Sequence, residues 1–137
     1  MYELFDHTAD VGLRMRAGSL DELFADAGRA LFSVIVANFD AVRPVQELAL
    51  RVDGDRHDDL LFDWLAELLY TFDARRLLLC DFRVRLDRTG LEATARGEPF
   101  DPDRHELDVE VKAITYHGLK VEQADDGTWL AEVIVDI

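Results

Sequence analysis

Two aspartates near opposite ends of the chain, Asp10 and Asp136, have the chemistry of metal ligands. Asp10 ends the segment HTAD (residues 7–10), and Asp136 lies in an apolar, strand-like pattern that persists to Ile137. Such a pattern predicts an anchored last residue with its α-carboxylate held in place. If Asp10 approached from a neighbouring loop, three carboxylates would converge, and their repulsion would favour a bound cation. The plainer alternative is a turn residue at Asp10 and a solvated acid at Asp136.

The only cysteine, Cys80, limits the kinds of metal site and the redox setting that the chain suits. One cysteine excludes an internal disulfide and a multi-cysteine zinc site, and it fits a reducing compartment. Hard oxygen ligands without sulfur favour Ca²⁺ or Mg²⁺ over zinc. Cys80 ends the apolar run LLLC (residues 77–80), which favours a buried small hydrophobe over a nucleophile.

The histidines raise the alternative of an enzyme. They are His7, His57, His105 and His117. No pair has HExxH or another short ligand spacing, and the sequence has neither a triad-like nucleophile signature nor a glycine-rich phosphate loop. A metal-dependent hydrolase that uses these histidines is therefore the weaker alternative.

Length and charge define the class of protein. The 137 residues are 49% hydrophobic with a formal net charge of -14, which predicts one globular domain over residues 1–137. An acidic field repels phosphate backbones, so we expect no stable nucleic-acid binding. It suits cations or a basic protein partner, or it serves solubility alone. With no signal-peptide pattern and no apolar segment of bilayer length, we expect a cytoplasmic protein away from membranes.

Two amphipathic helices are predicted to position these residues. Apolar residues recur at helical spacing over Ser19–Asn38, where Ser19 and Glu22 form a capping box that fixes the start. A second stripe predicts a helix over Asp58–Phe72 with two acids, Asp63 and Glu67, on its exposed face. We interpret those acids as solvated, with a partner contact as the alternative.

Period-two patterns predict the strands. Residues 82–86 and 91–95 flank the turn DRTG and predict a hairpin, whose outward residues Arg83, Arg85, Glu92 and Arg96 suggest cross-strand charge pairs. An RNA-reading basic strip is the alternative for that face. The segments 106–123 and 128–137 flank a turn at 124–127 and predict a second hairpin.

Three shorter runs also read as strands, namely 3–5, 12–16 and 45–52. The fold class expected from these elements is α+β, with two main helices packed on one antiparallel-rich mixed sheet in two layers.

Four segments together resemble the archease family over nearly the whole chain. They are HTADVGLRMRAGSLDELFADAGRAL, LLFDWLAELLYTFD, GEPFDPDRHELDVEVKAITYHGL and GTWLAEVIVDI, in the same order as in that family. The resemblance implies a fold related to strand-helix-strand-strand modules. It also implies a non-catalytic accessory protein of the RtcB-type tRNA-splicing RNA ligase, which promotes guanylylation of the ligase and multiple turnover.

The resemblance implies the site residues as well. The family's metal site falls on Asp10, Asp136 and the terminal carboxylate of Ile137, and we expect Ca²⁺ there, with Mg²⁺ or Mn²⁺ as alternatives. Functionally important charged residues carry over to Arg104 and Glu110, although Arg104 replaces the lysine expected at its position. An arginine keeps charge attraction but cannot supply a compact ammonium or lose a proton. A general chaperone or adaptor for RNA-modifying enzymes is the alternative function.

Overall fold

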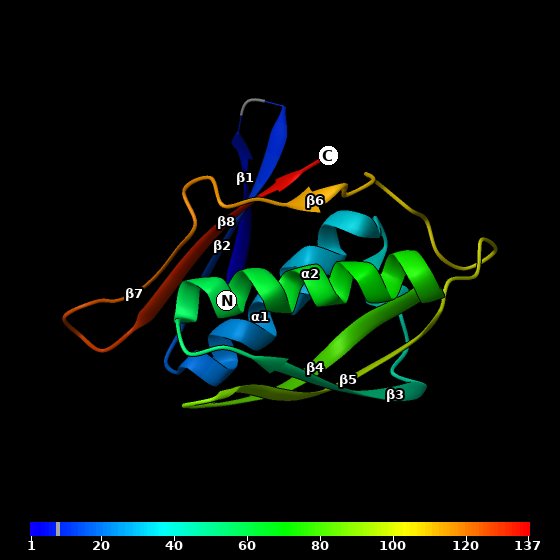
Figure 1. The fold of residues 1–137 in the computed structure, drawn as a ribbon. Coiled ribbons are helices and arrows are strands. Elements are labelled where there is room, and N and C mark those ends of the chain that lie inside the picture. Colours follow the sequence, from blue (N-terminus) through cyan, green and yellow to red (C-terminus); the bar gives the residue numbers. More distant parts are fainter. Residues whose placement is uncertain (8) are drawn as a thin grey trace.

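Two helices lie between two antiparallel sheets in this computed structural model, which describes residues 1–7 and 9–137 (Figure 1). The strands are β1 (Tyr2–His7), β2 (Asp10–Ala17), β3 (Gln46–Asp53), β4 (Leu77–Asp87), β5 (Gly90–Pro99), β6 (Ala113–Ile114), β7 (Lys120–Gln123) and β8 (Trp129–Asp136). The helices are α1 (Leu20–Ile35), the short 3-10 helix η1 (Phe39–Ala41) and α2 (His57–Arg75). The predicted α+β class with two main helices is confirmed.

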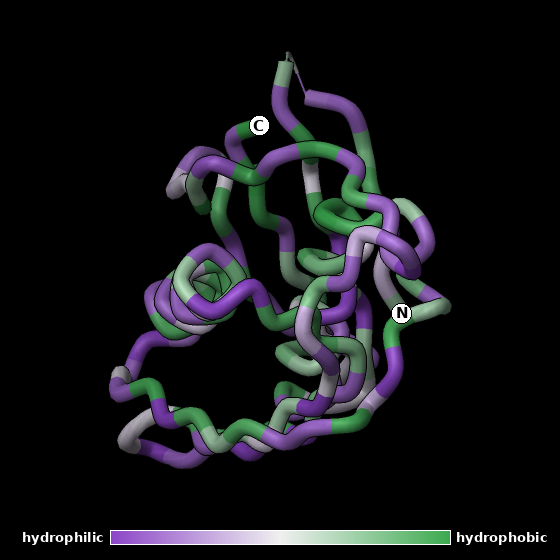
Figure 2. The backbone as a smooth tube through the Cα atoms, turned by 90° about the vertical axis from the view of Figure 1, so that its right-hand side faces the viewer, coloured by the Kyte–Doolittle hydropathy of each residue, from purple (hydrophilic) through white to green (hydrophobic). Residues whose placement is uncertain are grey.

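The strands form two sheets instead of the single sheet expected. One has the order β1-β2-β8-β6, with β7 also paired to β8, and the other has the order β3-β5-β4. Helix α1 contacts strands of both sheets, so the hydrophobic core runs between them. Figure 2 shows hydrophobic and hydrophilic residues alternating along the strands of the three-stranded sheet, the pattern expected when one face is buried.

Helix α1 begins where the sequence predicts and ends earlier. The Ser19 hydroxyl accepts a hydrogen bond of 3.2 Å from the Glu22 N–H, which is half of the predicted capping box; within residues 1–7 and 9–137 no reciprocal bond to the Glu22 side chain is present. The helix ends at Ile35 because Val36 is extended and pairs with Leu107. This pairing brings the 106–108 segment beside the end of α1.

Helix α2 extends beyond the predicted range at both ends. Its buried stripe includes Trp64, whose indole N–H donates to the Phe24 carbonyl of α1 at 3.0 Å and fixes the two helices together. The helix ends because Arg76 adopts a left-handed conformation with φ 51°. The acids Asp63 and Glu67 are exposed, as predicted.

The β4–β5 hairpin is confirmed, but its charge pairs differ from the prediction. The ion pairs join β5 to β3, through Arg96 with Glu47 at 3.1 Å and Arg51 with Glu92 at 3.5 Å. Strand β3 therefore supplies to β5 the charged partners that were expected from β4. At the turn, Gly90 has φ 146°, and a Cβ there would meet the Val52 carbonyl.

The predicted continuous strand over residues 106–123 is wrong for most of its length. Upstream of β7, only Ala113 and Ile114 pair with β8, because Ala113 lies opposite Asp136, the last residue of β8, and the residues before Ala113 lie beyond the end of that strand. Upstream, the Asp108 N–H donates to the Ile35 carbonyl at the end of α1. Residues 107–111 therefore form an irregular segment, called the strap from here on, that crosses from α1 to β6. The β7–β8 hairpin itself is confirmed.

Among the described residues, no helix is both long enough and apolar enough to cross a bilayer. Cys80 lies where the β4 register shifts between Leu79 and Asp81, half-buried against the core. Burial raises the pKa of its thiol, with Asp81 and Glu98 adding to the effect. A protonated thiol suits the predicted packing role better than a nucleophilic one.

Candidate functional site

Asp10 and Asp136 lie directly opposite each other in the five-stranded sheet. Asp10 begins β2 and Asp136 ends β8, and the antiparallel register pairs the two residues. The same row contains His7 of β1, opposite Asp10, and Ala113 of β6, opposite Asp136. Residues opposite one another in an antiparallel pair project from the same face. The sheet therefore sets two carboxylates and one imidazole side by side, and we call these four residues the Asp10 row.

The Asp10 row contains an unsatisfied nitrogen. His7 Nδ1 lies 3.8 Å from Asp10 Oδ2, beyond hydrogen-bonding distance. Among the described buried side-chain nitrogen and oxygen atoms, this Nδ1 alone has no hydrogen-bond partner. The ring of His117 lies 5.0 Å from the His7 ring and covers part of it. Both Asp10 and His7 therefore retain capacity for a further partner. Thr8, the second residue of the HTAD motif, lies outside the described residues.

The last residue is anchored beside this row. Ile137 is half-buried and packs against the hydrophobic core. The Lys112 N–H donates to the Asp136 carbonyl at 2.8 Å, so main-chain bonding holds β8 almost to its end. Figure 1 shows the C-terminus beyond β8, alongside β6.

The side chains alone do not complete a cation site. Among residues 1–7 and 9–137, no three His, Cys, Asp or Glu side chains are grouped closely enough to hold a metal ion. Two carboxylates oppose each other at Asp10 and Asp136. A third oxygen ligand would have to come from the main-chain carboxylate of Ile137.

A second group of charged residues surrounds Glu98, the penultimate residue of β5. Its carboxylate accepts a hydrogen bond of 2.6 Å from the Arg43 N–H, pairs with the Arg104 guanidinium and lies 3.1 Å from His105 Nε2. Because His105 Nδ1 accepts from the Asp101 N–H at 2.9 Å, Nε2 carries the proton and donates to Glu98. We call this set the Glu98 network.

The Glu98 network satisfies its own charges. Burial alone would raise the pKa of Glu98, but the bonds from the Arg43 N–H, Arg104 and His105 lower it to about 2. The Arg104 guanidinium also donates to the Ala41 carbonyl at 2.9 Å. Arg104, predicted as a partner-activation residue, is thus engaged inside the protein.

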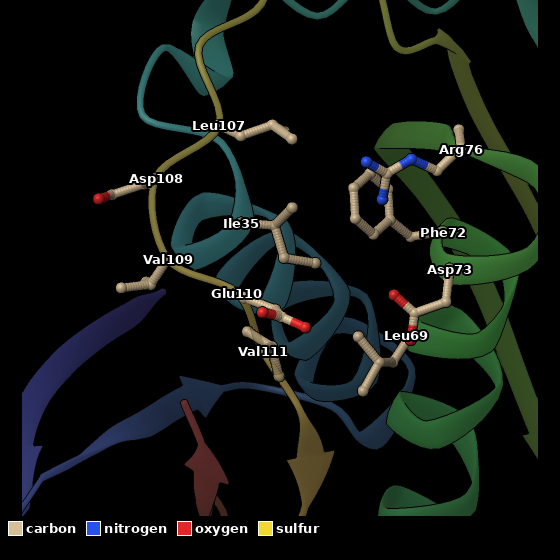
Figure 3. A pocket seen from close by; sticks show the side chains of 10 residues that line it. All are labelled: Ile35, Leu69, Phe72, Asp73, Arg76, Leu107, Asp108, Val109, Glu110 and Val111. Carbon is tan, nitrogen blue, oxygen red and sulfur yellow. The ribbon is translucent and has the colours of Figure 1, made fainter.

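Glu110, the other predicted activation residue, lines a pocket of about 340 Å³ between the strap and the end of α2 (Figure 3). Apolar and charged residues share the lining, and Glu110 and Asp73 turn toward each other from opposite sides. The pocket connects to the Asp10 row along the chain, because the strap continues into β6.

The sequence alone did not place His7 in the Asp10 row, nor Asp73 in the pocket beside the strap. The signal for His7 was present in the HTAD motif, which contains both His7 and Asp10, the residues that pair between β1 and β2. The signal for Asp73 was absent, since the strap meets α2 only in the folded chain. The remaining histidine, His57, packs edge-on against Trp129 at 5.6 Å.

The sequence and the fold have counterparts among known proteins. The sequence profile described as the Archease protein family (MTH1598/TM1083) matches residues 2–137. Protein archease of Pyrococcus furiosus is 41% identical over 99% of this chain and 98% of its own length, and that of Methanopyrus kandleri is 40% identical over 99% of each.

Two solved structures have the same fold. The solution structure of Methanobacterium thermoautotrophicum protein 1598 superposes with a TM-score of 0.88 and 34% identity, over 99% of this chain and 98% of that one. The Thermotoga maritima structure, described as an archease and possible chaperone, has a TM-score of 0.69 and 22% identity, over 100% and 98% of the chains. The class is thus the small α+β archease fold. The chain belongs to the archease family.

Proposed function

We propose that this protein is a non-catalytic activator of an RtcB-type RNA ligase, and that it works through a divalent ion at Asp10, Asp136 and the carboxylate of Ile137. In this proposal it promotes guanylylation of the ligase and repeated turnover in tRNA splicing or RNA repair. The family membership supports an accessory role, and the ligase is the partner implied by the sequence resemblance. The cytoplasm, where such a ligase works, is the proposed location.

The observation that carries the proposal is the register of the Asp10 row. Two carboxylates face each other across β2 and β8 with no cationic side chain of the described residues within 4.0 Å, apart from His7 at 3.8 Å. Like charges placed opposite one another destabilise a sheet unless something compensates them. The unsatisfied His7 Nδ1 is a second sign that the row accepts a further partner. The residues therefore fit a cation.

The donor chemistry favours a hard ion. Asp10, Asp136 and the Ile137 carboxylate would supply oxygen ligands, which suit Ca²⁺, with Mg²⁺ or Mn²⁺ as alternatives. When bound, such an ion would neutralise the converging charges and present a Lewis acid at the end of the sheet. The chain's own contribution is rigidity, because Asp136 is held by pairs on both sides, to Asp10 and Ala113.

Activation requires that the protein bind the reactive state of the ligase more tightly than the resting state. The acidic surface supports a basic protein partner and disfavours direct RNA binding, given the net charge of -14. We propose that the end of the five-stranded sheet docks near the guanylylation centre of the ligase and stabilises its reactive arrangement.

The test is guanylylation of the ligase from GTP, with and without this protein, at limiting divalent metal. Wild type should accelerate the reaction, whereas Asp10→Asn and a chain lacking Ile137 should lose the acceleration and keep their fold by circular dichroism. Asp125→Asn, in the exposed β7–β8 turn, is the matched control and should retain it. Full stimulation by Asp10→Asn and by the shortened chain would refute the site.

A general chaperone or adaptor is the second candidate function, because the Thermotoga maritima relative is described as a possible chaperone. That role requires a binding face but no ion. If EDTA-treated protein prevents aggregation of a client enzyme as well as untreated protein does, and no ligase is stimulated, the chaperone function replaces the first proposal.

A further inference from the structure

The pocket between α2 and the strap has the construction of a binding site for an amphipathic group. Its walls include Ile35, Leu69, Phe72 and Val111, and its volume of about 340 Å³ lies within the range of small-ligand sites. Figure 3 shows the side chains of Asp73 and Glu110 on opposite sides of this apolar space. A group with an alkyl stem and a charged end would contact both kinds of surface.

The charges of the pocket select the sign of that group. Asp73, on α2, and Glu110, on the strap, form no ion pair or side-chain hydrogen bond with any residue in the described part of the chain. Arg76 also lines the pocket, with its guanidinium 4.7 Å from the centre of the Phe72 ring, and it keeps its positive charge there. Two carboxylates against one guanidinium leave a net negative charge, which favours a cationic guest.

We propose that this pocket receives a lysine or arginine side chain of the partner protein. The alkyl stem would lie on Leu69 and Val111, and the cation would lie between Asp73 and Glu110. This inference rests on the proposed function, because it names the chemistry by which the ligase is held.

The pocket and the Asp10 row have separable tasks. Binding energy gained at the pocket lowers the concentration at which the protein acts, whereas the Asp10 row determines the stimulation reached at saturation. Loss of the pocket should therefore shift the half-maximal concentration and leave the maximum unchanged. Loss of the Asp10 row should lower the maximum and leave the half-maximal concentration unchanged.

The experiment measures ligase guanylylation as a function of this protein's concentration. The double variant Asp73→Asn/Glu110→Gln should raise the half-maximal concentration at least about tenfold, and less so at high salt, with the maximum unchanged. Asp108→Asn is the matched control, because Asp108 borders the same pocket on the strap but its side chain points away from Asp73 and Glu110 (Figure 3). Glu67→Gln is the control on the exposed face of α2.

A second readout does not depend on the ligase. Nuclear magnetic resonance titrations with the acetylated methylamides of lysine and of arginine should shift the methyl signals of Ile35, Leu69 and Val111 in wild type and not in the double variant. The compound that binds more tightly in this titration identifies the guest residue. Acetylated glutamate methylamide should cause no shift.

The inference is overturned if the double variant and Asp108→Asn have the same half-maximal concentration, whatever the model compounds do. It is also overturned if neither basic compound shifts those methyl signals. A ligase that wild type fails to stimulate at any concentration contradicts the proposed function itself, and that result is distinct from an unchanged half-maximal concentration.

Discussion

The Glu98 network and the Asp10 row combine the same residue types in opposite ways. Each contains a histidine beside a carboxylate. In the first, His105 donates to Glu98, whose remaining charge is met by Arg104 and the Arg43 N–H. In the second, two aspartates face each other and His7 Nδ1 has no partner among the described residues.

The difference separates a structural role from a binding role. A buried carboxylate with every oxygen engaged adds to the stability of the fold and has little left to offer a ligand. Opposed carboxylates at the end of a sheet reduce stability until a cation arrives. Substitution of one member of each group tests this difference.

The largest expected effect is on the Glu98 network. Glu98→Gln removes the charge that faces Arg104 and His105 and should lower the free energy of unfolding by about 3 kcal/mol, because the new NH2 group faces a donor where a carboxylate oxygen accepted and Arg104 loses its counter-charge. Urea unfolding measures this. Glu47→Gln breaks the exposed pair with Arg96 and should change stability by less than about 0.5 kcal/mol. Equal effects of the two substitutions would contradict the assignment.

The protonation of Glu98 should also be visible in the pH dependence of the free energy of unfolding. The pKa of Glu98 falls from 4.5 to about 2 on folding, so its contribution is complete above pH 4.5 and is lost as the pH falls toward 2. Wild type should therefore lose more stability than Glu98→Gln between those values. Parallel unfolding curves for the two proteins would show that Glu98 is not the group responsible.

A smaller effect is expected at the C-terminus. One glycine added after Ile137 moves the α-carboxylate by about 3.8 Å and should weaken Ca²⁺ binding at least about tenfold, while the melting temperature of the metal-free protein stays the same. Calorimetric titration measures the affinity. An unchanged affinity would remove Ile137 from the proposed ligands.

The smallest effect is on stability without metal. In EDTA, Asp10→Asn should leave the free energy of unfolding unchanged or raise it by up to about 0.5 kcal/mol, because it relieves repulsion from Asp136. Urea unfolding gives the sign of this change in the free energy of unfolding. A clear loss of stability would mean that Asp10 is compensated inside the protein, as Glu98 is.

Local patterns in the sequence predicted the elements well where packing is periodic. The Ser19 cap, the buried stripe of α2 and the turn before Gly90 are set by neighbours within a few residues, and each was placed correctly. Residues 106–112 alternate like a strand, but in the register that pairs Ala113 with Asp136 they lie beyond the end of β8. That placement of two distant segments leaves no local trace in the sequence.

The candidate site was predictable only in part. The apolar pattern to Ile137 indicated an anchored end, but the pairing of Asp10 with Asp136 joins residues far apart in the sequence, and no local pattern contains it. The resemblance to a family named both residues, and the register gives a physical reason for them. The engagement of Arg104 with Glu98 was not predictable, because it depends on where β5 ends.

We propose that Asp10, Asp136 and the Ile137 carboxylate together hold a divalent ion, and calorimetric titration of the purified protein with Ca²⁺ measures this binding. We expect one ion per chain for wild type and for Glu98→Gln, and no binding for Asp136→Asn. Wild-type protein that binds none of Ca²⁺, Mg²⁺ and Mn²⁺, or Asp136→Asn that binds Ca²⁺ as wild type does, would contradict it.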